Sequence, residues 1–141
     1  MSTDTRLAEF VAAQDAVYDQ VRRELAAGRK ESHWIWFIFP QLVGLGQSYM
    51  AKKFGIASKD EALRYLQHPV LGLRLRESTE LLLALPSGDI TCILGYPDDL
   101  KFRSCLTLFA AVAPDELVFR SALEKFYDGK PDNLTLDLLL E

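Results

Sequence analysis

Apolar residues recur three or four positions apart along almost the whole chain, and this periodicity limits the possible folds more than any other feature. In the N-terminal part the recurring positions are Leu7, Phe10, Val11, Val17, Tyr18, Val21 and Leu25. Such spacing places apolar side chains on one face of an α-helix. The chain lacks the strict alternation of apolar and polar residues that indicates a half-buried β-strand. The sequence therefore predicts an all-α fold.

Proline, glycine and capping residues divide this pattern into separate helices. Gly28 suits the end of the first helix, and residues 58–61 form a capping box. The segment 33–39 is almost entirely apolar and is interpreted as a short buried helix rather than a strand. The other predicted helices cover residues 4–27, 47–54, 58–67, 69–85, 89–94, 97–114, 115–127 and a final stretch from Asp132. We expect about seven or eight helices in one multihelical bundle, with residues 1–141 forming a single domain.

Charge and cysteine content restrict the partners and the compartment. The 16 basic and 20 acidic residues leave a net charge of −4, which opposes binding to a nucleic acid duplex. No apolar run approaches the roughly 18 residues of a membrane helix, and the first residues lack the plan of a signal peptide. Cys92 and Cys105 do not have the spacing of a metal or redox motif. We expect a cytoplasmic protein that has no disulfide, metal site or cofactor and does not bind a membrane.

Residues 32–48 hold the densest group of side chains typical of a binding site. The candidates in this stretch are His33, Trp34, Trp36, Gln41, Gly44 and Gly46. Aromatic walls with a few polar groups are typical of small-molecule pockets, a histidine can act as a general base, and glycine allows close approach of the backbone. The alternative is that the aromatic residues are core and that the histidine is partly buried and satisfied by hydrogen bonds.

Gln14 is a polar residue on the apolar face of the first predicted helix, between Val11 and Tyr18. A buried amide must find hydrogen-bond partners, because leaving it unpaired costs about 1–3 kcal/mol. Gln14 can therefore either hold a loop in place or point into a ligand pocket.

Lys101 and Ser104 share one face of the helix predicted after Pro97. With Arg103 nearby, this helix start could hold a phosphate or a carboxylate. The alternative is a structural ion pair between Lys101 and Asp98, since the acidic residues at the helix start would repel an anion.

The string His33-Trp34-Ile35-Trp36-Phe37-Ile38-Phe39-Pro40-Gln41, followed by Gly44-Leu45-Gly46 and later by Phe126-Tyr127-Asp128-Gly129, resembles a bacterial family known as domain of unknown function 1810. The resemblance covers nearly the whole chain and implies an all-helical single domain. Members are sometimes labelled calpastatin, a label that belongs to long, disordered inhibitors and does not suit this compact chain. A more distant, fold-level similarity to the NADAR N-glycosidases supplies no catalytic acids that match positions here.

Two hypotheses for the function follow. The first is a protein that binds or hydrolyses a nucleotide-like ligand of the ADP-ribose type, with a hydrolase that cleaves a glycosidic bond as the favoured form. It uses His33 and Lys101 as catalytic residues, and its ligand-binding residues are Gln14, Trp34, Trp36, Gln41, Gly44, Gly46 and Ser104. It requires Gln14, His33, Gln41 and Lys101 to converge on one concave site. The second is a non-catalytic interaction module or homodimer that uses the partly exposed aromatic segment as a docking surface. A third possibility is that this segment is entirely core and that other surface residues carry the function.

Overall fold

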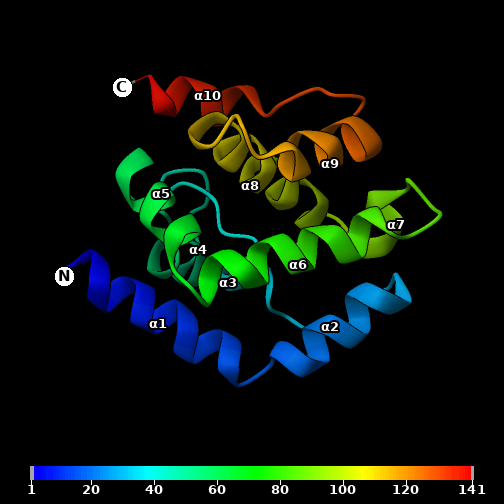
Figure 1. The fold of residues 1–141 in the computed structure, drawn as a ribbon, viewed down its shortest axis with the longest axis horizontal. Helices are drawn as coiled ribbons and strands as arrows, with labels where there is room; N and C mark the ends of the chain where they lie inside the picture. Colours follow the sequence, from blue (N-terminus) through cyan, green and yellow to red (C-terminus); the bar gives the residue numbers. More distant parts are fainter. Residues whose placement is uncertain (1, 141) are drawn as a thin grey trace.

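The computed structural model describes residues 2–140, which form ten α-helices and no β-strand (Figure 1). The helices are α1 (Thr3–Asp15), α2 (Tyr18–Ala27), α3 (Ile35–Ile38), α4 (Tyr49–Lys53), α5 (Lys59–Gln67), α6 (Leu71–Leu83), α7 (Ile90–Leu94), α8 (Asp98–Val112), α9 (Leu117–Tyr127) and α10 (Asn133–Leu139). The predicted all-α class is confirmed. The predicted number of helices, seven or eight, is too low for the described residues.

The helix predicted over residues 4–27 is divided into α1 and α2. The chain leaves the helical conformation at Val17, with φ −134° and ψ −1°. A straight helix over that range would be roughly 36 Å long. Instead, α1 packs against α3 and α6 while α2 packs against α6, and the two helices meet at an angle (Figure 1). Both α1 and α2 pack onto the core on either side of this break. Neither a proline nor a glycine marks the break in the sequence.

Helices α6 and α8 form the centre of the molecule. Helix α6 packs against α1, α2, α3, α5 and α9, and α8 packs against α3, α5, α7, α9 and α10. The side chains of Phe102, Leu106 and Phe109 on α8 are fully buried. Since α3 contacts both α6 and α8, the aromatic segment lies between the two central helices.

The loop between α3 and α4 is joined to the segment that follows α4. Leu42 and Ile56 form an isolated parallel bridge. The N–H of Val43 donates to the carbonyl of Ile56, and the N–H of Ile56 donates to the carbonyl of Gln41, both at 2.9 Å. These bonds hold Gln41 at the start of the loop, immediately after the buried aromatic segment.

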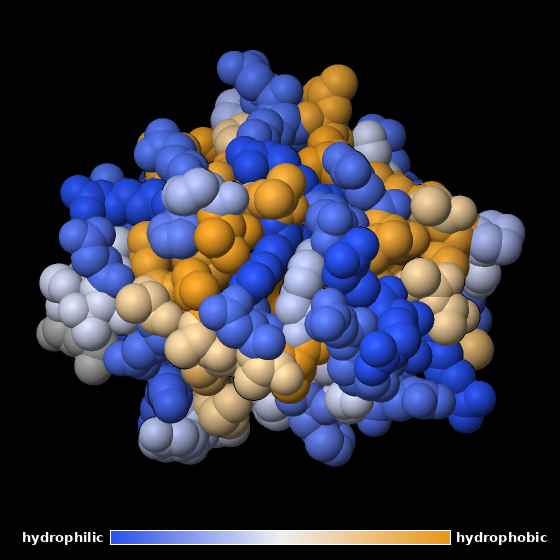
Figure 2. All heavy atoms as spheres, turned by 60° about the horizontal axis from the view of Figure 1, so that its bottom comes forward, coloured by the Kyte–Doolittle hydropathy of each residue, from blue (hydrophilic) through white to orange (hydrophobic). Residues whose placement is uncertain are grey.

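Apolar residues on the face shown in Figure 2 lie in separate groups among polar side chains. The most exposed large apolar residues of the described chain include Tyr49, Leu73, Tyr96, Leu117, Leu134 and Leu140. None of the helices in residues 2–140 is both long enough and apolar enough to span a membrane.

Candidate functional site

The aromatic segment is mostly core. Trp34 and Phe39 are each 1% exposed, and Ile35, Phe37 and Ile38 are buried with them. The indole N–H of Trp34 donates a hydrogen bond of 3.0 Å to Oε1 of Glu24. Trp34 therefore lacks the free ring face that stacking on a ligand requires. Within residues 34–39 only Trp36 stays partly exposed, so little of the aromatic surface that the interaction-module hypothesis uses is open to a partner.

Glu24 holds the chain that leads into this segment. Its carboxylate accepts hydrogen bonds from the N–H groups of Glu31 and Ser32, from the hydroxyl of Ser32 and from the amide of Gln20. Burial by itself raises the pKa of this carboxyl group, but the hydrogen bonds outweigh burial and lower the pKa to about 2. Glu24 is therefore ionised at neutral pH and fixes residues 31–34 on α2.

Gln14 has a structural role in the core and does not line the pocket beside Trp36. Its side-chain NH2 donates to the carbonyl of Phe37 at 2.6 Å and to the hydroxyl of Tyr65 at 3.0 Å, and its oxygen accepts from Arg74 at 3.3 Å. Gln14 is 1% exposed. The amide ties α1 to α3, and it has no donor left for a ligand.

His33 is exposed and does not line the pocket beside Trp36. The four residues that the hydrolase hypothesis requires at one concave site are therefore not brought together. Gln41 and Lys101 do meet, whereas Gln14 lies in the core and His33 at the surface.

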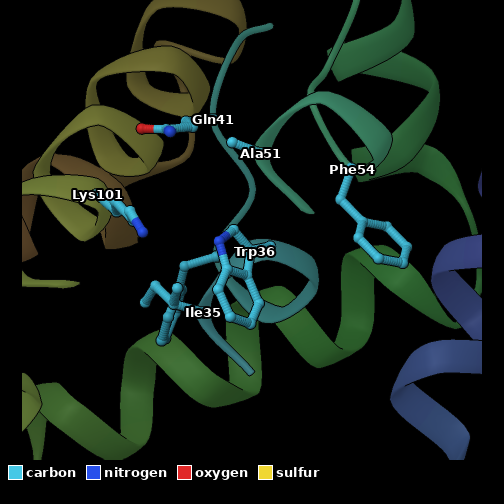
Figure 3. Close-up of a pocket in the computed structure, with 7 residues that line it drawn as sticks. Ile35, Trp36, Gln41, Ala51, Phe54 and Lys101 are labelled. Carbon is cyan, nitrogen blue, oxygen red and sulfur yellow. The ribbon is translucent and has the colours of Figure 1, made fainter. Parts of the chain in front are cut away.

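A narrow pocket lies where the aromatic segment meets α8 (Figure 3). Its lining consists of Ile35, Trp36, Phe39, Gln41, Ala51, Phe54 and Lys101. In Figure 3 the indole nitrogen of Trp36 and the ammonium of Lys101 turn toward the same space, and Gln41 comes from the loop above them. The volume within the pocket is about 10 Å³, which is room for about one water molecule or one oxygen atom of a ligand.

Three hydrogen-bond donors at this pocket have no protein acceptor among residues 2–140. Nε1 of Trp36 is buried and has no partner. The ammonium of Lys101 lies 5.4 Å from the centre of the Trp36 ring, and its nearest carboxylate oxygen, on Asp98, is 3.8 Å away. The side chain of Gln41, which lines the same pocket, makes no hydrogen bond within the described chain. Leaving a buried N–H unpaired costs about 1–3 kcal/mol, so this corner suits a hydrogen-bond acceptor.

Asp98 is shared by two lysines. Its Oδ2 lies 2.9 Å from Nζ of Lys30, whose side chain is only 6% exposed. Lys30 also donates to the carbonyl of Ser32 and lies 4.8 Å from the centre of the Trp34 ring. The predicted pair between Lys101 and Asp98 exists, but Asp98 is closer to Lys30. Two ammonium groups and one carboxylate leave this cluster with one net positive charge.

A wider cleft of about 300 Å³ adjoins the narrow pocket and shares Gln41 and Lys101 with it. Its other lining residues are Leu45, Gly46, Pro97, Leu100, Arg103, Ser104, Asp132 and Leu134. The hydroxyl of Ser104 shares its one proton between the carbonyl of Leu100 and Oδ2 of Asp132, both at 3.2 Å. That same oxygen of Asp132 accepts from the N–H and the hydroxyl of Thr135 and so caps α10.

The two glycines of the loop have different structural roles. Gly44 has φ +100°, a backbone conformation that residues other than glycine rarely adopt. Gly46 lines the cleft, and a Cβ there would lie 2.6 Å from Cβ of Ala51 and 3.3 Å from Nε2 of Gln41. Gly46 thus lets the loop close against α4 beside Gln41.

The structure brings five of the sequence-predicted residues together, namely Trp36, Gln41, Gly46, Lys101 and Ser104. Sequence reasoning missed the contribution of Lys30 through Asp98, and the cleft residues Leu45, Leu100, Asp132 and Leu134. The sequence signals Asp132 only as a helix cap. No local pattern places Lys30, which is distant in the chain, beside α8. Among the described residues, no group of three or more His, Cys, Asp or Glu side chains is arranged to hold a metal ion.

Comparisons with known proteins agree with this architecture. The chain is similar to the crystal structure of the conserved hypothetical protein Rv1873 from Mycobacterium tuberculosis, with 48% sequence identity, a TM-score of 0.94 and 96% of each chain covered. None of the curated proteins matches the chain. The model of the family described as "Protein of unknown function (DUF1810)" matches residues 4–139. The chain therefore belongs to the DUF1810 family.

Proposed function

We propose that the protein binds a small anionic molecule at the corner formed by Trp36, Gln41 and Lys101. The observation that carries this proposal is the buried indole N–H of Trp36, which has no protein acceptor and lies beside the ammonium of Lys101. A carboxylate or phosphate oxygen placed there would accept a hydrogen bond from the indole and a charge-assisted one from the lysine. Its negative charge would balance the net positive charge of the Lys30, Asp98 and Lys101 cluster.

The dimensions of the site support a small ligand. The inner pocket has room for about one oxygen atom, and the adjoining cleft of about 300 Å³ lies at the lower end of the range of ligand pockets, ~300–1,000 Å³. One oxygen of the anionic group would enter the inner pocket, and the rest of the ligand would lie in the cleft. The phosphate of a nucleotide or a sugar phosphate and the carboxylate of an organic acid share this chemistry.

Binding explains the arrangement better than hydrolysis does. A glycosidic hydrolase requires an acid or base within reach of the bond that it cleaves. His33 is exposed and does not line the pocket, Asp98 is paired with Lys30 at 2.9 Å, and Asp132 caps α10. The proposal therefore assigns Lys101, Gln41 and Trp36 the role of binding residues.

The experiment is a thermal-shift titration with sodium phosphate against sodium chloride at equal ionic strength, because screening alone changes surface electrostatics. AMP and ADP-ribose are titrated in parallel. Binding at a hundredfold excess over the Kd adds about 2.7 kcal/mol to the free energy of unfolding, so the midpoint should rise clearly. Lys101→Met and Gln41→Ala should remove the shift, and Trp36→Phe should weaken it by removing one donor while keeping an aromatic ring.

The matched control is Lys59→Met, which removes an exposed lysine at the start of α5, outside both pockets. It should keep the phosphate-dependent shift. If none of the anions raises the midpoint, or if Lys101→Met retains the full shift, the proposal is wrong.

A further inference from the structure

We infer that the ligand of this cleft carries an apolar arm next to its anionic group, in the manner of an aryl or alkyl phosphate or carboxylate. This inference rests on the proposed anion site. It concerns the part of the ligand that extends from Gln41 and Lys101 into the wider cleft.

The apolar side chains of the cleft are Leu45, Pro97, Leu100 and Leu134. Leu134 is 65% exposed and Leu100 is 47% exposed, so both leave apolar surface of the cleft in contact with water. A single exposed leucine is ordinary on a protein surface. Here the two come from different helices, α10 and α8, and line the same concavity next to unpaired donors, which is the composition of a ligand pocket.

Some polar groups of the cleft already have partners in the protein, whereas Oδ1 of Asp132 and the two terminal NH2 groups of Arg103 make no hydrogen bond within the described residues. Ser104 donates to the carbonyl of Leu100 and to Asp132, and Oδ2 of Asp132 also accepts from Thr135. Nε of Arg103 donates to the carbonyl of Lys130. A sugar arm brings several hydroxyl groups that lose their water on binding and need new partners. Since Ser104 is already bonded to Oδ2 of Asp132, and since Leu45, Leu100 and Leu134 supply apolar surface, an apolar arm suits this side of the cleft.

The test compares two phosphate monoesters with the same head group, phenyl phosphate and ribose 5-phosphate, in calorimetric titrations of the full chain. Burying about 50 Å² of the phenyl ring should make phenyl phosphate bind on the order of tenfold more tightly. Leu134→Ser should reduce this preference to near one. Leu73→Ser is the matched control, because Leu73 is 64% exposed on α6 and lies outside the cleft. It should keep the preference.

The outcomes separate this inference from the proposed function. If both monoesters bind with equal affinity, or if ribose 5-phosphate binds more tightly, the inference of an apolar arm is wrong. The proposed anion site is still supported in that case. A preference for phenyl phosphate that survives in Leu134→Ser also overturns the inference, since the ring would then bind elsewhere. If neither monoester nor inorganic phosphate binds, the anion site itself is wrong.

Discussion

The indole N–H of Trp34 donates a 3.0 Å hydrogen bond to the carboxylate of Glu24. Two residues later, the indole N–H of Trp36 is also buried but has no acceptor in the described chain. The two tryptophans of one short motif thus have different roles. Trp34 holds the motif on α2, and Trp36 presents an unused donor beside Lys101.

Glu24→Gln should lower the stability at neutral pH and reduce the sensitivity to acid. The folded-state pKa of Glu24 is about 2, below the ordinary 4.5, because hydrogen bonds to its carboxylate outweigh burial. Its contribution is therefore fully present above about pH 4.5 and is lost as the pH falls toward 2, amounting to roughly 3 kcal/mol. Urea unfolding between pH 2.5 and 7 should show a shallower pH dependence in the variant. Glu124→Gln, at an exposed site, serves as control. Equal slopes in the wild type and Glu24→Gln would contradict this account.

Gln14→Leu should destabilise the fold by about 2–3 kcal/mol and leave anion binding intact. Leucine fills a similar volume but leaves the carbonyl of Phe37 without its donor and the hydroxyl of Tyr65 without a partner in the core. Urea unfolding and phosphate titration measure the two effects separately. The exposed Gln67, replaced by alanine, should change neither. Loss of anion binding in a variant of normal stability would instead place Gln14 in the site.

Gly46→Ala should both destabilise the protein and weaken anion binding. The added Cβ would lie 2.6 Å from Ala51 and 3.3 Å from the amide of Gln41, so the loop must shift at a cost of about 1–3 kcal/mol. Gly88→Ala is the control, because a Cβ there meets nothing closer than 3.4 Å. Thermal midpoints with and without phosphate report both effects. If Gly46→Ala binds phosphate as the wild type does, Gly46 does not position Gln41.

His33→Ala should change the free energy of unfolding by less than about 0.5 kcal/mol and leave anion affinity unchanged. His33 is exposed and lies outside the pocket of Trp36 and Lys101, and exposed substitutions away from special features have small effects. Thermal shift and calorimetry with phosphate measure both quantities. A marked loss of affinity in His33→Ala, comparable to that in Lys101→Met, would show that His33 contributes to anion binding.

Helix ends were predictable because they depend on neighbouring residues. Ser58 accepts a hydrogen bond from the N–H of Glu61, which is one half of the predicted capping box, while the carboxylate of Glu61 accepts from the N–H of Ala57 instead of Ser58. Gly28 ends α2 with φ +73°, and Asp132 caps α10. The division between α1 and α2 was missed, because the conformation of Val17 accompanies packing on α6 rather than any local signal.

The sequence by itself determined the all-α class, most helix boundaries and the candidate segment around Trp36 and Gln41, because apolar periodicity, caps and glycines act over a few residues. Only the tertiary structure decided which polar groups form hydrogen bonds within the protein and which remain without a partner. Gln14 donates to the carbonyl of Phe37 on α3 and to Tyr65. Trp34 donates to Glu24, and Lys30 pairs with Asp98 from a distant part of the chain. Whether a donor is satisfied depends on such long-range contacts, which sequence spacing does not encode.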